Sequence, residues 1–215
     1  MMEIDQIRRD YTRGGLRRAQ LPADPFDLFE LWQQQAIDCR LPDPTAMVLA
    51  TVAEDGQPSQ RIVLLKQVDA RGFVFYTNYR SRKARELDGN GHASLLFPWH
   101  TMERQIKICG CVTRVDGVES QRYFASRPRE SQLAAWASPQ SAPIDSRDAL
   151  LAEVARMQKT FANKEQVPLP EFWGGIRVVP DTIEFWQGGA GRLHDCFIYR
   201  RQSQGSAWSL TRLAP

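Results

Sequence analysis

The sequence predicts a mainly β protein whose short antiparallel strands close into a barrel or sandwich, with helices packed outside. Runs rich in β-branched and aromatic residues follow one another with only short polar turns between them, and such neighbours pair antiparallel. No Gly-x-Gly-x-x-Gly motif follows a strand, which argues against a doubly wound nucleotide-binding fold. Neither a repeat nor a flexible linker divides the chain, so we expect one domain over 1–215, with a helical segment over 1–42 and the barrel over 43–215.

The elements are expected in the following order. Ile4, Ile7 and Tyr11 have helical spacing that Gly14 ends, and Asp24 with Pro25 is a typical helix start. The second helix should turn its apolar residues towards a core: Leu28, Phe29, Leu31, Trp32 and Ile37. Strands are predicted over 45–53, 60–68, 73–78, 92–98, 104–115, 175–179, 182–187, 196–201 and 208–213. Further helices are predicted over 82–88, 117–127, 129–137 (after the break at Pro128) and 146–161.

The composition of the chain limits the classes of protein to which it can belong. The chain has 215 residues, 42% apolar and 25% charged, with a net charge of only +3, so nucleic-acid binding is not expected. The polar first 13 residues do not resemble a secretory signal, and no apolar run is long enough for a membrane span. The four cysteines form no Cys-x-x-Cys pair, and Cys109 and Cys111 are expected to be buried structural thiols. These features favour a reducing cytoplasm.

The segment Arg61-Ile-Val-Leu-Leu-Lys66 places charged residues at both ends of an apolar strand. Alternation puts Arg61, Val63 and Leu65 on one face and Ile62, Leu64 and Lys66 on the other. Buried cations need anionic partners. The alternative is that both ends reach solvent and only the middle is buried.

The segment from Tyr76 to Lys83 joins the end of a strand to the start of a helix. Free backbone N–H groups, the Thr77 hydroxyl, and the adjacent Arg82 and Lys83 make an anion site there. An exposed basic helix start is the alternative. The segment from Tyr123 to Ser131, which contains Arg127, offers groups for a second phosphate, or else is a helix face with solvated arginines.

A glycine-rich loop follows Trp186 and leads to Arg192-Leu193-His194-Asp195. Glycines let the backbone approach a flat ligand, Arg192 can pair with an anion, and His194 can carry a proton with Asp195 orienting it. The alternative is a surface hairpin with a solvent salt bridge. With three histidines in the chain and none at His-x-x-x-His spacing, no metal site is expected.

Taken together, these segments resemble the pyridoxine 5'-phosphate oxidase family. The matching stretches are RRDYTRGGLRR at 8–18, DPTAMVLATV at 43–52, RIVLLK at 61–66, FYTNYRSRKA at 75–84, LLFPWHTMERQ at 95–105, YFASRPRESQ at 123–132, FWGGIRV at 172–178, IEFWQGGAGRLHD at 183–195 and RLAP at 212–215. Each is weak alone, but their occurrence in this order along nearly the whole chain is specific.

The resemblance implies a split β-barrel homodimer with FMN at the subunit interface. It implies oxidation of pyridoxine and pyridoxamine 5'-phosphates to pyridoxal 5'-phosphate in vitamin B6 biosynthesis and salvage, with O2 giving H2O2, and ammonia from the amine. The implied FMN contacts are Arg61, Ile62, Val63, Leu64, Leu65, Lys66, Tyr76, Thr77, Arg82, Lys83, Gln105, Gln140, Ser141, Trp186 and position 196. The implied substrate contacts are Arg8, Arg9, Asp10, Tyr11, Lys66, Tyr123, Arg127, Ser131, Leu193 and the catalytic pair Arg192 and His194. Arg13, Arg17 and Arg18 are assigned no role.

One position departs from the family pattern. The family reads RLHDR where this chain has Cys196, and the missing arginine is an FMN contact in the family. We therefore expect weaker FMN retention, which Cys196→Arg should reverse, unless water or another arginine covers the gap. We also expect an exposed, oxidation-prone thiol there.

Three other functions are weighed against the oxidase: a flavin or pyridoxal-phosphate carrier without turnover, a flavin reductase using a nicotinamide cofactor, and a nucleic-acid module. The last is disfavoured because the basic residues are interleaved in the strands.

Overall fold

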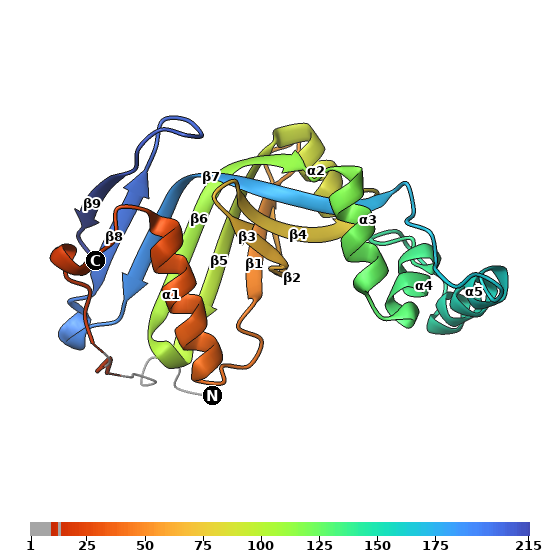
Figure 1. Cartoon of the computed structure of the whole chain (residues 1–215), viewed down its shortest axis with the longest axis horizontal. Coiled ribbons are helices and arrows are strands. Elements are labelled where there is room, and N and C mark those ends of the chain that lie inside the picture. The colour runs from red at the N-terminus through yellow and green to blue at the C-terminus, as the bar shows by residue number, and fades with distance from the viewer. Residues whose placement is uncertain (1–9, 13) are drawn as a thin grey trace.

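A computed structural model describes residues 10–12 and 14–215 of the chain (Figure 1). Arg8, Arg9, Arg13 and most of the first predicted helix therefore lie outside the described residues. Within them, no helix is long and apolar enough to cross a membrane.

A nine-stranded antiparallel sheet forms the body of the described chain, as the sequence predicts. Its order is β2-β1-β5-β6-β7-β4-β3, with β8 between β7 and β9. The strands are β1 (Ala46–Val52), β2 (Pro58–Leu64), β3 (Gln67–Asp69), β4 (Gly72–Asn78), β5 (His92–Trp99), β6 (Arg104–Arg114), β7 (Trp173–Gln187), β8 (Asp195–Arg200) and β9 (Ser209–Leu213).

The sheet curls because the strands at its two ends, β2 and β3, follow each other directly in the chain. The prediction of a single strand over 60–68 is wrong: the chain bends between β2 and β3. At the bend Leu65 N–H donates to the carbonyl of Thr45, beside β1, while Lys66 N–H donates to the carbonyl of Val74 in β4. Since β2 and β3 lie at opposite ends of the order, this bend brings the two edges together as a half-barrel.

Strand β7 divides the sheet. The two strands predicted over 175–179 and 182–187 are one strand, whose irregularity is absorbed by a register shift opposite Cys109 and Gly110. The bulge accommodates Pro180, which has no N–H to donate. The first half of β7 pairs with β4 and the second half with β8. Figure 1 shows the consequence: β8 and β9 lie at the left of the view and extend the sheet beyond the second half of β7.

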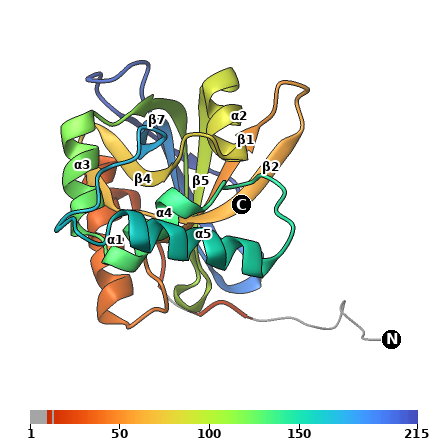
Figure 2. The ribbon, with the colours of Figure 1, turned by 90° about the vertical axis from the view of Figure 1, so that its right-hand side faces the viewer.

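Helices cover the sheet at two places (Figures 1 and 2). They are α1 (Pro25–Asp38), α2 (Arg82–Asn90), α3 (Gly117–Ser126), α4 (Arg129–Ala137) and α5 (Arg147–Thr160), with 3-10 turns at Arg18–Gln20, His100–Met102 and Ala190–Arg192. The Asp24 side chain caps α1 by accepting from Phe26 N–H, and Pro128 separates α3 from α4, both as predicted. While α1 packs against the barrel, α3, α4 and α5 gather at the end away from β9.

Two predicted core positions on α1 are wrong. Phe29, Trp32 and Ala36 are buried, but Leu31 and Ile37 are 53% and 48% exposed. A helix turns by about 100° per residue, so each of these two lies well away from the buried stripe. The prediction of buried thiols also fails for Cys111, which is exposed, while Cys109 is half-buried.

Candidate functional site

A cavity of about 810 Å³ opens between β2, β4, α3 and α4. Its size lies within the range of cofactor and ligand sites. Twelve of the predicted contacts line it: Arg61, Ile62, Val63, Leu64, Lys66, Tyr76, Thr77, Lys83, Tyr123, Arg127, Ser131 and Gln140. The sequence reasoning missed other residues of the wall, among them Asn78, Ser138 and Trp173.

Strand β2 forms one wall, and its predicted alternation is confirmed. Arg61 and Val63 are half-buried, whereas Ile62 is 71% and Leu64 43% exposed. Leu65 belongs to the hydrophobic core, so its side chain does not line the cavity.

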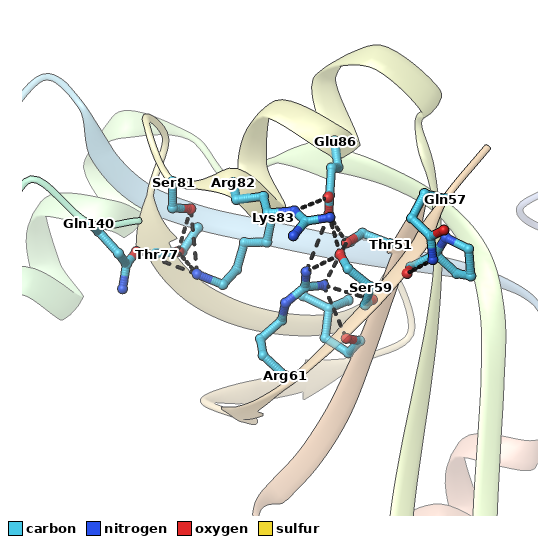
Figure 3. A network of polar contacts seen from close by, with 12 residues as sticks. Thr51, Gln57, Ser59, Arg61, Thr77, Ser81, Arg82, Lys83, Glu86 and Gln140 are labelled. Atoms are coloured by element: carbon cyan, nitrogen blue, oxygen red, sulfur yellow. Dashed lines mark hydrogen bonds and ion pairs between the residues drawn. The ribbon is translucent and has the colours of Figure 1, made fainter. Parts of the chain in front are cut away.

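The Arg61 guanidinium is held inside the protein, as Figure 3 shows. It donates to the hydroxyls of Thr51 and Ser59 and to the carbonyls of Leu49 and Ser59, and it pairs with Glu86 at 3.2 Å. Of the alternative in which both ends of the segment reach solvent, the part that concerns Lys66 is correct, because Lys66 is exposed. The part that concerns Arg61 is wrong, because the Arg61 guanidinium is bound by the groups above and its side chain is only 20% exposed. Its anionic partner within the chain is a glutamate of α2.

Glu86 is the buried centre of this network. It accepts from Thr51, from Ser59 at 2.7 Å and from Arg82 Nε at 2.7 Å. Burial alone would raise the pKa of Glu86, but the hydrogen bonds from Thr51, Ser59 and Arg82 lower it to about 2. The sequence analysis missed Glu86, although its spacing from Arg82 is that of an i,i+4 ion pair.

Lys83 is a buried cation with loosely placed partners. Its Nζ lies 3.4 Å from Thr77 Oγ1, 3.5 Å from Ser81 Oγ and 3.4 Å from Gln140 Oε1. Burial, followed by repulsion from Arg61, lowers the pKa of Lys83. A bound anion would relieve both effects, which supports the predicted anion site at the start of α2.

Arg127 provides a second cationic position in the same cavity. Its guanidinium lies 4.7 Å from the ring centre of Trp173, and burial lowers its pKa. Nη1 is buried and has no hydrogen-bond partner among the described residues. Beside it, Tyr123 stacks on Tyr76 with ring centres 3.9 Å apart. An unsatisfied guanidinium beside flat aromatic rings fits a phosphorylated ring compound.

A second set of the predicted contacts lies at the other end of β7. The rings of Tyr11, Trp186 and His194 lie together, with Trp186 and His194 centres 4.6 Å apart and Tyr11 edge-on to both. His194 Nδ1 accepts from Gly189 N–H at 3.1 Å, so the neutral ring carries its proton on Nε2. Arg192 and Leu193 are exposed next to this cluster, and Arg192 has a left-handed backbone with φ 66°.

Two expectations about this end of the site are wrong. Asp195 does not orient His194, because its carboxylate accepts from Leu16 N–H and Arg212. Cys196 is not an exposed thiol: it is 5% exposed, and burial raises its pKa to about 11.

The predicted contacts thus form two groups within one chain. Trp173 of the cavity and Trp186 of the aromatic cluster lie on the same strand, thirteen residues apart. At about 3.3 Å per residue, this corresponds to roughly 40 Å along the strand. Of the other predicted contacts, Asp10 and Ser141 are exposed, and Ser141 follows Gln140 with φ 70°. Residues 10–12 and 14–215 contain no cluster of three or more potential metal ligands.

Comparisons with known proteins agree with the resemblance. Residues 33–161 match the family model of pyridoxamine 5'-phosphate oxidase, and 173–215 match the pyridoxine 5'-phosphate oxidase C-terminal dimerisation region. The chain is 56% identical over 214 residues to pyridoxine/pyridoxamine 5'-phosphate oxidases of Teredinibacter turnerae and Aeromonas hydrophila, covering 100% of each chain. It is 54% identical to that of Escherichia coli, covering 97% of the relative. PhzG from Burkholderia lata, solved with tetrahydrophenazine-1-carboxylic acid, superimposes with TM-score 0.87 at 32% identity over 94% of this chain and 99% of its own. The chain therefore belongs to the pyridoxine/pyridoxamine 5'-phosphate oxidase family.

Proposed function

We propose that this protein is an FMN-dependent oxidase that converts pyridoxine and pyridoxamine 5'-phosphates to pyridoxal 5'-phosphate. Dioxygen is the electron acceptor and gives hydrogen peroxide, and the amine also releases ammonia. The observation that carries the proposal is a pair of separate cations in one aromatic-walled cavity: the buried Lys83, and the half-buried Arg127 with its buried Nη1, unpaired among the described residues. Two phosphorylated ligands that bind near each other need two such positions, because their charges repel.

The residues around α2 hold the flavin phosphate. Lys83 supplies the buried charge, while Arg82 is largely exposed and has both terminal guanidinium nitrogens available beyond its Nε contact with Glu86. Arg61 acts from a fixed position, because Glu86, Thr51 and Ser59 already bind it. Held by these residues, FMN would supply the redox chemistry, which is acceptance of a hydride from the substrate and transfer of the electrons to dioxygen.

The substrate phosphate binds to Arg127, Tyr123, Ser131 and Lys66. Arg192 and His194 lie over the pyridine ring and fix its position. The Nε2–H of a neutral His194 is a donor to the substrate, and Arg192 positions the substrate for the transfer. Tyr11, which packs on His194, closes this side of the site.

The two groups of contacts come from different subunits of a homodimer. In this arrangement, the cavity of one copy faces the aromatic cluster of the other. The separation of the groups along β7 supports this, as does the match of 173–215 to a dimerisation region. The exposed apolar side chains of Ile62 and Leu64 at the cavity mouth also favour a surface that a second copy covers.

The direct test supplies FMN and pyridoxamine 5'-phosphate to the purified protein and follows pyridoxal 5'-phosphate and peroxide. We expect both products in equal amounts. Flavin binding without turnover would instead favour the carrier. Oxidation of NADPH without a B6 substrate would favour the reductase.

A further inference from the structure

Three of the predicted flavin contacts lie outside the cavity, on one face of the sheet near the aromatic cluster of Tyr11, Trp186 and His194. Gln105, Trp186 and Cys196 are direct partners across β6, β7 and β8. Residues directly opposite each other in antiparallel strands point to the same face. The next row on that face, two residues along each strand, is Lys107, Glu184 and Ile198. The opposite face is fully buried core, formed by Ile106, Phe185 and Phe197.

Position 196 contributes no charge to this face. The Cys196 thiol is buried, and its pKa is raised to about 11 by burial and by the Glu184 carboxylate, while Lys107 acts in the opposite direction. In the strand register Glu184 is a diagonal neighbour of Cys196 on β7, and Lys107 pairs with Glu184 from β6. A thiol that stays neutral cannot make the charged hydrogen bond of the arginine found here in the family.

A cation is nevertheless present one row away. Lys107 Nζ pairs with Glu184 at 2.9 Å, and the Lys107 side chain is 48% exposed while that of Glu184 is 18% exposed. An arginine at 196 would lie diagonally across from Glu184, within reach of a long side chain. Glu184 thus holds a lysine on the same face of the sheet as position 196, with Glu184 itself lying between the two on β7.

We propose that Lys107, positioned by Glu184, supplies to the flavin site the positive charge that position 196 lacks. This inference rests on the proposed function, since it assigns Lys107 to the same flavin that Gln105 and Trp186 contact. It also limits the expected loss of FMN affinity, because the missing arginine has a substitute on the same face of the sheet, on β6 across the intervening β7.

The test measures FMN affinity by quenching of flavin fluorescence, without turnover. Lys107→Met removes the charge and keeps most of the apolar stem. We expect it to raise the Kd for FMN about ten- to hundredfold, the loss of one charged hydrogen bond. The matched control is Lys159→Met, which removes an exposed charge on α5 and should leave the Kd within about twofold. Lys107→Arg should retain binding. Thermal unfolding without FMN checks that each variant is folded.

A second arm uses Cys196→Arg. Added to Lys107→Met it should restore most of the FMN affinity, whereas in the wild-type background it should tighten binding much less. Equal Kd values for wild type and Lys107→Met, or equal losses in Lys107→Met and Lys159→Met, would overturn the inference and leave the oxidase proposal standing. Failure of the wild-type protein to bind FMN would instead overturn the proposed function.

Discussion

Replacing Glu86 with glutamine removes the negative charge that binds Arg61 of β2 and Arg82 at the start of α2, next to the cavity. The pKa of Glu86 falls from 4.5 to about 2 in the folded protein. At about 1.4 kcal/mol per tenfold change in proton affinity, this corresponds to about 3 kcal/mol of folding free energy. Water screens part of it, because Arg82 is 56% exposed. We therefore expect Glu86→Gln to lower the free energy of unfolding by about 2 kcal/mol at pH 7.

Urea unfolding of the FMN-free protein measures this difference, with Glu153→Gln as the control. Glu153 pairs with Arg156 on the surface of α5, where solvent screens the pair, so its loss should have a much smaller effect than the loss of Glu86. Because the folded pKa of Glu86 lies below the unfolded one, its contribution is complete above pH 4.5 and is lost as the pH falls towards 2. The difference in free energy of unfolding between wild type and Glu86→Gln should therefore be constant from pH 7 to 5 and should shrink at lower pH. A gap no larger than that of Glu153→Gln, or one that widens in acid, would refute this reasoning.

Three further outcomes are expected. Arg127→Ala should raise the KM for pyridoxamine 5'-phosphate at least about tenfold and leave the Kd for FMN nearly unchanged, because the two phosphates bind different cations. At pH 7.5 a thiol reagent should modify exposed Cys111 at least about a hundredfold faster than Cys196, whose pKa is about 11. Gly110→Ala should destabilise the protein by about 1–3 kcal/mol in urea unfolding, because a Cβ there would overlap the backbone carbonyl at Val179; Gly117→Ala, with open space around it, should not.

Local patterns were sufficient to predict most of the secondary structure. Asp24 with Pro25 marks the start of α1, and Pro128 marks the break between α3 and α4, because capping and proline geometry act within a few residues. The two strand errors have a different origin. The bend at Leu65 is imposed by closure of the barrel and leaves no local signal. At the bulge opposite Gly110, Pro180 is a local signal of an interruption, and only the pairing with β6 shows that the strand continues through it.

In the site, too, local features could be predicted from the sequence, whereas contacts between distant elements could not. The basic segments at Arg61 and at Lys83 are recognisable in the sequence, and the structure brings both to one cavity. Which partners hold them is a tertiary property: Glu86 binds Arg61 from another element, and Asp195 is bound by Arg212 and Leu16 instead of orienting His194. Nothing local in the sequence indicates that the cavity and the aromatic cluster lie at opposite ends of β7.

Complementation between two variants tests the shared site most directly, when pyridoxamine 5'-phosphate is kept far enough below the KM of Arg127→Ala that neither variant alone has appreciable activity. Arg127→Ala damages the cavity and Arg192→Ala damages the second group, so a mixed dimer keeps one intact site only if each site takes its two groups from different subunits. Random pairing of equal amounts should then restore about a quarter of wild-type activity. As the control, Arg127→Ala mixed with Lys83→Met, two cavity variants, should stay inactive. Recovery in the first mixture and none in the second is the predicted result, and no recovery in either would contradict a site built from two copies of the chain.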